Sequence, residues 1–315
     1  MSGSKAYKIL PDGSESRFSL NDVKLQGIPE NSILAEFNGK TGCEVLSDRV
    51  IMQLREKGLA GYDLAEEIGC RLSAILFVVK KGKDLEKGDR DFWNQCNSIY
   101  LAGYYFRGDP GKAVEKSVKR NLEILNIPDI TLHLLDTEVT PSLLGCGLFG
   151  EPSVKDRLVF DFGHTNVKRG LVRYRNAEIE RVKEFSYIPL SGFEKVQDRI
   201  QAEQLNEIIA AVIVGTYHEV REIGREVSEE IVMCIANNIL DGCIAPRGYY
   251  GILSSLGEDY PKVLKETLQE AGVNFQFYIM NDVKAITYLC KPKDKQAAVI
   301  SLGTNLGIGY PGFRY

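Results

Sequence analysis

The sequence has no long hydrophobic run and no basic tract. No apolar stretch reaches the roughly 18 residues that a membrane span requires. Residues 1–16 are polar and contain no apolar core of a signal peptide. With 39 basic and 43 acidic residues the formal net charge is −4, and no run of Lys and Arg resembles a nucleic-acid footprint. We therefore expect a cytoplasmic protein that binds neither membranes nor nucleic acid.

The sequence also lacks paired or clustered cysteines. It contains only three histidines, and no two cysteines form a CxxC pair. Disulfide frameworks and structural zinc sites are built from closer or even spacings. We expect reduced, mostly buried thiols and no zinc. The seven cysteines are Cys43, Cys70, Cys96, Cys146, Cys234, Cys243 and Cys290.

The composition is that of an ordinary globular protein. Apolar residues make up 44% of the 315 positions and charged residues 26%, which excludes a disordered or fibrous chain. A chain of this length usually forms two domains or one large α/β unit. Segments with helical and strand-like apolar spacing alternate along it, which predicts an α/β fold. The predicted helices are 59–80, 111–125, 141–150, 197–213, 217–240 and 261–271, and the predicted strands are 97–103, 130–135, 275–280 and 297–302.

The most regular stretch, 157–174, predicts a β-hairpin whose turn carries polar residues. Asp161, Gly163, Thr165 and Lys168 lie in the segment VFDFGHTNVKRGLV. Glycine lets backbone amides approach phosphate oxygens, threonine adds a hydroxyl, and a strand-end aspartate can hold Mg²⁺ through water. The alternative is a plain hairpin in which the turn supplies positive φ and Asp161 accepts turn hydrogen bonds.

Two further segments carry candidate residues at strand ends. VISLGTNLGIGYPG follows a buried strand with Gly303, Thr304 and Gly307, and it suits a second phosphate loop or a simple glycine-rich bend. Asn281 and Asp282 follow the strand FYIM. A carboxylate at this position can accept a hydroxyl proton during phosphoryl transfer, but Asn-Asp before a helix is also a good N-cap.

Together these segments resemble the bacterial ROK-family sugar kinases of the actin-like ATPase superfamily. The matching patterns are Asp-x-Gly-x-Thr-x-x-Lys-x-Gly-Leu-Val, then Asn-Asp-x-x-Ala, then Gly-Thr-x-x-Gly-Ile-Gly. In that family the first pattern stands at the N-terminus, whereas here it begins near residue 157. Residues 38–51, 98–103 and 141–150 resemble family segments that normally follow the second phosphate loop. The resemblance therefore implies a circular permutation, which compact domains tolerate because their termini are often exposed and close together.

The resemblance implies two ribonuclease-H-like domains flanking a nucleotide cleft. The larger, 1–136 with 293–315, would carry the adenosine side and the second phosphate loop. The smaller, 137–292, would carry the first phosphate hairpin and the catalytic aspartate. ATP and Mg²⁺ are the implied cofactors, and a homodimer is compatible with the family.

Each candidate residue takes its role from this resemblance. Asp282 would be the general base, and Asn281 would bind a small-molecule acceptor, a sugar or an analogue. Asp161 would hold Mg²⁺ through water. The nucleotide would be bound by Asp161, Gly163, Thr165, Lys168, Gly303, Thr304, Gly307 and Gly103.

The sequence differs from the family pattern at several positions. His164 replaces a glycine of the first phosphate loop, and Lys284 replaces an asparagine after the catalytic aspartate. No Glu-x-Gly-His segment is present, and of the family's cysteine cluster only Cys43 remains. The main prediction is an ATP-dependent sugar kinase. The alternative is a non-catalytic ligand-binding sensor or scaffold that retains the fold.

Overall fold

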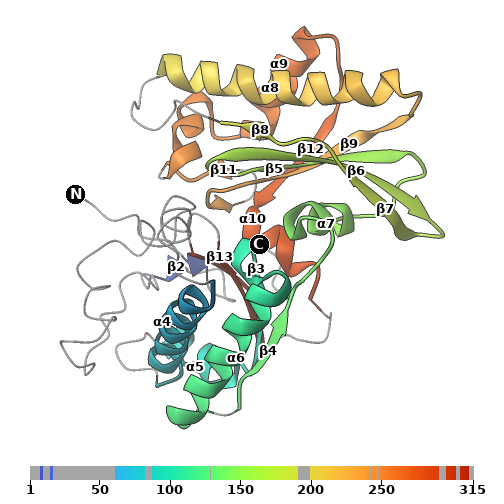
Figure 1. Ribbon diagram of the computed structural model, residues 1–315. Coiled ribbons are helices and arrows are strands. Elements are labelled where there is room, and N and C mark those ends of the chain that lie inside the picture. The colour runs from blue at the N-terminus through green and yellow to red at the C-terminus, as the bar shows by residue number, and fades with distance from the viewer. Residues whose placement is uncertain are drawn as a thin grey trace. The chain divides into compact units, whose positions relative to one another are not determined.

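The chain forms two units with a β-sheet in each. The computed structural model in Figure 1 divides by its internal contacts into a first unit, Met1–Glu138 with Cys290–Tyr315, and a second unit, Val139–Leu289. The sequence-based bounds were 1–136 with 293–315 and 137–292. The residues that the structure describes are 8–9, 15–16, 61–81, 87–127, 129–190, 199–240, 243–246, 248–290, 296–302 and 306–311.

The sheet of the second unit combines an antiparallel meander with two parallel strands. Its order is β12-β9-β5-β6-β7, and the short strand β8 also pairs with β6. β6 is antiparallel to both β5 and β7, whereas β9 is parallel to β5 and β12 is parallel to β9. The bounds are β5 Asp156–Phe162, β6 Asn166–Arg175, β7 Glu178–Glu184, β8 Ile188–Pro189, β9 Val227–Ile235 and β12 Gln276–Asn281.

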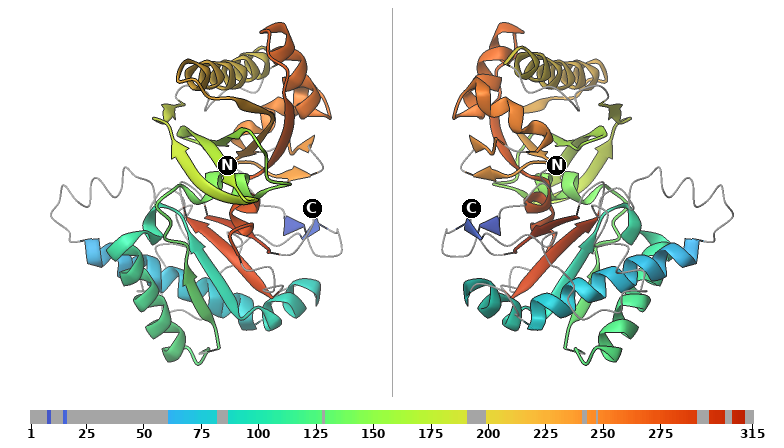
Figure 2. Two further views of the ribbon diagram at one scale, coloured as in Figure 1. Left: turned by 90° about the vertical axis from the view of Figure 1, so that its right-hand side faces the viewer. Right: turned by 90° about the vertical axis from the view of Figure 1, so that its left-hand side faces the viewer.

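Alternate side chains of these strands face two different layers of helices. Figure 2 shows α8 (Arg199–Glu222), drawn in gold, lying along one face of this sheet. On that face the buried Phe160 and Phe162 cluster with residues of α8, of α9 (Tyr260–Glu270) and of the 3₁₀ segment η3 (Tyr249–Leu256).

The other face is covered by two short helices, α7 (Pro141–Leu148) and α10 (Asp282–Thr287). Val159, Val232 and Cys234 of the sheet pack there with Leu143 and Ala285 of the helices.

The backbones of α7 and α10 are in direct contact at Gly145. A Cβ added to Gly145 would lie 1.9 Å from the carbonyl oxygen of Ala285, so only glycine fits at this position. The small-residue composition of 141–150 predicted a helix that packs closely against another backbone, and this prediction is confirmed.

The first unit contains a smaller mixed sheet. Its order is β14-β13-β3-β4, with β13 antiparallel to β14 and parallel to β3, and β3 parallel to β4. Ile99, Leu101 and Ile300 face the core formed with α4 and α6. The strands are β3 Ser98–Ala102, β4 Thr131–Leu134, β13 Ala297–Leu302 and β14 Leu306–Gly309, and the helices are α4 Gly61–Lys81, α5 Lys87–Gln95, η2 Tyr104–Phe106 and α6 Gly108–Ile124.

Four two-residue strands complete the described elements, in two antiparallel pairs. β1 (Lys8–Ile9) pairs with β2 (Glu15–Ser16), and β10 (Ile239–Leu240) pairs with β11 (Cys243–Ile244). No helix among the described residues is long and apolar enough to cross a bilayer.

Most predicted elements are confirmed, and the chain is an α/β protein as expected. The predicted hairpin corresponds to β5 and β6, with its second strand beginning at Asn166 rather than Gly170. The glycine-rich loop predicted after residue 302 contains β14. The predicted helices 59–80, 111–125, 141–150, 197–213 and 261–271 correspond to α4, α6, α7, α8 and α9, and the predicted strands 97–103, 130–135, 275–280 and 297–302 to β3, β4, β12 and β13.

The predicted helix over 217–240 is wrong. α8 continues to Glu222, and Val227–Ile235 forms β9 between β5 and β12. The continuous apolar run IVMCI fits a buried helix segment or a central strand equally well by spacing. Burial against helices on both sheet faces is what favours the strand, and that burial is a tertiary property.

Candidate active site

The centre of the candidate site is the carboxylate of Asp161, near the end of β5. The residue is buried, with 4% of its surface exposed. Lys168 stands directly opposite on β6, and its Nζ donates to Asp161 Oδ2 at 2.6 Å. The Ser142 hydroxyl of α7 donates to the same oxygen, also at 2.6 Å. The three-residue turn of the hairpin therefore brings two of the predicted residues into an ion pair, and α7 adds a third contact.

Asp282 shares the electrostatic environment of this pair. Burial and the nearby Asp161 carboxylate raise the pKa of Asp282 to about 6, while Lys168 opposes that rise. The Asp161 carboxylate raises the pKa of Lys168, and Asp282 adds a smaller contribution of the same sign. Asp161 and Lys168 are thus in direct contact, and Asp282 lies within electrostatic range of that ion pair. A carboxylate with a pKa near 6 is ionised at neutral pH and still basic enough to accept a proton.

Asn281 caps the helix that begins at Asp282. Its Oδ1 accepts hydrogen bonds from the backbone N–H groups of Val283 at 2.9 Å and Lys284 at 3.2 Å. Its Nδ2 donates to the carbonyl oxygen of Asn237 at 2.9 Å. Asn281 therefore has the capping role that the alternative interpretation gave to the Asn-Asp pair. Binding of an acceptor by Asn281 stays a prediction.

A hydrogen bond from η3 stabilises the turn between β5 and β6. The Tyr250 hydroxyl donates to the Gly163 carbonyl oxygen at 2.7 Å, and the Gly163 N–H donates to the Asn166 carbonyl at 3.1 Å. None of the residues 163–166 has a positive φ, so the turn does not need glycine for that reason. This part of the plain-hairpin alternative is wrong.

The other two turn residues differ in exposure. Thr165 is exposed, and its Oγ1 accepts a hydrogen bond from Asn166 Nδ2 at 3.3 Å. His164 is partly buried beside Tyr249, with ring centroids 5.7 Å apart. Burial lowers the pKa of His164, so its imidazole is neutral at neutral pH and adds no positive charge to the turn.

The remaining predicted residues belong to the first unit. Gly103 follows β3 with φ 115°, and a Cβ there would lie 2.2 Å from the Leu302 carbonyl oxygen. Gly103 is therefore required by the contact between the ends of β3 and β13. Gly307 lies on β14 opposite Ser301. Gly303 and Thr304 lie outside the described residues.

The donor chemistry at Asp161 fits a magnesium ion. Mg²⁺ is usually held by one or two carboxylates together with waters and substrate phosphates. The two donors from Ser142 and Lys168 both contact Oδ2. Oδ1 takes part in neither of these two hydrogen bonds. Within the described part of the chain, no three His, Cys, Asp or Glu side chains form a metal-binding group.

The cysteines that the structure describes contribute no ligand set to this site. Cys96, Cys146, Cys234 and Cys290 are buried free thiols, and Cys243 is an exposed free thiol. Burial and the adjacent Cys146 raise the pKa of Cys234 well above its ordinary value, so this thiol stays protonated. Cys43 lies outside the described residues.

Sequence reasoning missed Ser142 and Tyr250. Both act through a hydrogen bond to a residue that was predicted, Asp161 and Gly163 respectively. Ser142 follows a proline at the start of a small-residue helix, and nothing in that pattern points to a partner 19 positions later. A buried tyrosine likewise gives no local signal of where its hydroxyl points.

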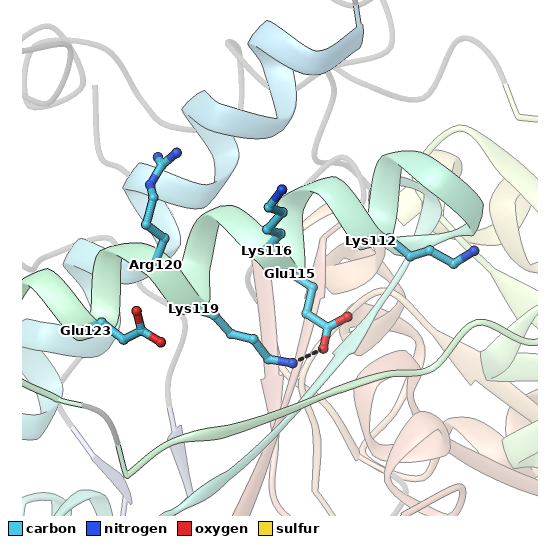
Figure 3. Close-up of a pocket in the computed structure, with 6 residues that line it drawn as sticks. All are labelled: Lys112, Glu115, Lys116, Lys119, Arg120 and Glu123. Atoms are coloured by element: carbon cyan, nitrogen blue, oxygen red, sulfur yellow. Dashed lines mark hydrogen bonds and ion pairs between the residues drawn. The ribbon is translucent and has the colours of Figure 1, made fainter.

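The first unit has a hollow along α6. Figure 3 shows its lining of charged side chains on α6, including an ion pair of 2.6 Å between Lys119 and Glu115. None of the predicted site residues lines it. Its lining residues are Lys112, Glu115, Lys116, Lys119, Arg120 and Glu123.

No protein-family model matches the chain, and no curated protein matches it significantly. The resemblance to ROK-family kinases stays a prediction based on motifs. Inference of a function therefore depends on the chemistry of Asp161, Lys168 and Asp282.

Proposed function

We propose that this protein is an ATP-dependent phosphotransferase that phosphorylates a hydroxyl group of a sugar or sugar-like metabolite. The observation that carries the proposal is the grouping of Asp161, Lys168 and Asp282 in the second unit. Phosphoryl transfer needs mainly positioning and charge neutralisation. A cation, a carboxylate able to hold Mg²⁺ and a second carboxylate able to accept a proton supply these needs.

In the proposed reaction Asp282 is the general base. The acceptor hydroxyl oxygen forms a bond to the γ-phosphorus of ATP while the bond from that phosphorus to the β–γ bridging oxygen breaks. ADP leaves with that electron pair, and the hydroxyl proton passes to the Asp282 carboxylate. Lys168 carries a positive charge that the phosphates would attract. Mg²⁺, when bound near Asp161, would neutralise charge on the phosphate oxygens.

The topology of the second unit supports a ribonuclease-H-like domain. Three antiparallel strands, β5 to β7, are followed in the chain by two strands that extend the sheet in parallel on the β5 side, with helices on both faces. Asp161 and Asp282 lie at the carboxyl ends of β5 and β12. Ligands of open α/β sheets bind at that edge.

The first unit supports the proposed permutation. Its antiparallel pair, β13 and β14, comes last in the chain, although it adjoins the parallel strands β3 and β4, which come first. If the chain were read from β13 onward, hairpin would precede parallel strands, as it does in the second unit. A circular permutation would produce this order without changing the sheet.

The hydrogen bonds of Asn281 favour a second candidate function, a ligand-binding sensor without turnover. Both ends of its side-chain amide are engaged within the protein, by α10 and by Asn237. An acceptor would have to compete for these bonds. The absence of a Glu-x-Gly-His segment points in the same direction.

ADP formation from ATP across a panel of sugars, with Mg²⁺ present, tests the two candidates. We expect acceptor-dependent turnover that Asp282→Asn abolishes while nucleotide binding is retained. Asp259→Asn is the matched control, since Asp259 also stands at the start of a helix, α9, but has no part in the site. Nucleotide binding without turnover by the parent protein would favour the sensor. Normal turnover by Asp282→Asn would exclude the proposed base.

A further inference from the structure

We infer that Ser142 is a positioning residue that fixes the carboxylate of Asp161 for a divalent cation. This inference rests on the proposed function, in which Asp161 holds the cation. Ser142 Oγ lies 2.6 Å from Asp161 Oδ2, and both residues are buried, each with 4% of its surface exposed. A hydrogen bond to an ionised carboxylate is stronger and more directional than one between neutral groups.

The helix that carries Ser142 is itself fixed. Ser142 and Gly145 are three positions apart on α7, so they lie on the same side of the helix. Gly145 packs without a Cβ against the Ala285 carbonyl of α10, the helix that begins at Asp282. One helix face therefore contacts Asp161 through Ser142 and adjoins the element that carries Asp282. Any shift of α7 would move the hydroxyl relative to both carboxylates.

The two donors to Asp161 Oδ2 differ in how firmly they are held. The Lys168 side chain is 41% exposed and its ammonium ends a flexible stem, so it can turn toward a phosphate. Ser142 is short, buried and part of a helix. If Lys168 turned toward a phosphate, Ser142 would still donate to Oδ2 and fix the orientation of the carboxylate, whose Oδ1 takes part in neither bond. The serine thus supplies orientation, whereas the lysine supplies charge.

The test measures Mn²⁺ binding to the full chain in the presence of ADP, from the electron paramagnetic resonance signal of free Mn²⁺. The variants are Ser142→Ala, which removes the hydroxyl, and Ser142→Thr, which retains one. Ser228→Ala is the matched control. Ser228 is also a buried serine of the second unit, but its Oγ accepts a hydrogen bond from the Glu230 N–H. Thermal unfolding of each variant is recorded in parallel.

We expect Ser142→Ala to raise the Kd for Mn²⁺ about tenfold, the lower end of the effect of removing a partner of a metal ligand. Ser142→Thr and Ser228→Ala should stay within about twofold of the parent protein, a change of no more than about 0.4 kcal/mol. An unchanged Kd in Ser142→Ala would overturn the inference. An equal rise in the Kd for Mn²⁺ in Ser228→Ala or in Ser142→Thr would also overturn it.

The same measurement separates this inference from the proposed function. If the parent protein binds Mn²⁺ with ADP but phosphorylates no acceptor, the proposed function fails, while the Kd values of the Ser142 variants still decide the role of the hydroxyl. If the parent protein binds no Mn²⁺ with ADP, both fail, because Asp161 then holds no cation.

Discussion

Replacing glycine by alanine should lower the stability of the protein at Gly145, in the contact between α7 and α10, and raise it at Gly215. In Gly145→Ala the new Cβ would lie 1.9 Å from the Ala285 carbonyl oxygen and 2.5 Å from its carbon. In Gly215→Ala, on the exposed side of α8, the new Cβ would have no atom within 4 Å. The same chemical change is thus made in two helices of one unit, once against a backbone and once in open space.

The expected magnitudes follow from these distances. A backbone carbonyl cannot rotate aside, so α7 and α10 must separate by more than about 1 Å to relieve the contact. Overpacking of a close-packed interior typically costs about 1–3 kcal/mol, and a backbone clash belongs at the upper end, about 2–3 kcal/mol. Gly215→Ala should stabilise by about 0.5–1 kcal/mol, because alanine has the higher helix propensity.

Thermal unfolding followed by circular dichroism measures both effects. In a unit of about 150 residues, 1 kcal/mol shifts Tm by about 2–4 °C. Gly145→Ala should therefore lower Tm by about 4–12 °C, and Gly215→Ala should raise it by about 1–4 °C. A Tm for Gly145→Ala equal to that of the parent protein would refute the close approach of α7 to α10. The same result would also refute the argument that α7 holds Ser142 in place.

Three further predictions concern Asp282 and Tyr250. The pKa of Asp282 in the folded protein, about 6, lies above its ordinary value, so the native state binds this proton more tightly than the unfolded chain does. Stability should fall as the pH rises from about 4 to 6. Asp282→Asn should unfold at a higher temperature than the parent protein at pH 7 but not at pH 4. An equal difference in Tm between the two proteins at both pH values would contradict the raised pKa of Asp282. Turnover should rise with pH through about 6 and then level off, and a flat pH–rate profile between pH 5 and 8 would count against Asp282 as the base. Tyr250→Phe removes the donor to the Gly163 carbonyl and should lower the free energy of unfolding by about 1–2 kcal/mol in urea titrations. Tyr217 of α8 is a partly buried tyrosine whose ring packs on Phe275, and Tyr217→Phe, which keeps that ring, should change the free energy of unfolding by less than about 0.5 kcal/mol.

Local sequence patterns predicted the elements whose contacts are mostly local. The hairpin of β5 and β6 has a three-residue turn, and a short turn fixes which residues stand opposite. The pairing of Asp161 with Lys168 is a consequence of that register. The helical spacing in 261–271 likewise gave α9, whose Asp259 side chain caps its first turn.

The prediction over 217–240 failed because it depended on burial. The run IVMCI in β9 is apolar at every position, so spacing alone does not distinguish helix from strand. Its place between β5 and β12, with helices on both faces, is set by contacts with residues far away in the chain. Asn281 shows a related limit, since the same side chain suits a cap and an acceptor ligand until its partners are known.

The sequence by itself determined the α/β class, most strands and helices, the presence of Asp161 and Asp282 at strand ends, and that of Lys168 in the same hairpin as Asp161. Only the tertiary structure decided that these three share one electrostatic environment, that Ser142 contacts Asp161, and that Tyr250 holds the turn at Gly163. The physical reason is range. Backbone conformation and turn geometry depend on neighbours within a few residues, whereas burial, pKa and buried hydrogen bonds depend on side chains that folding brings together.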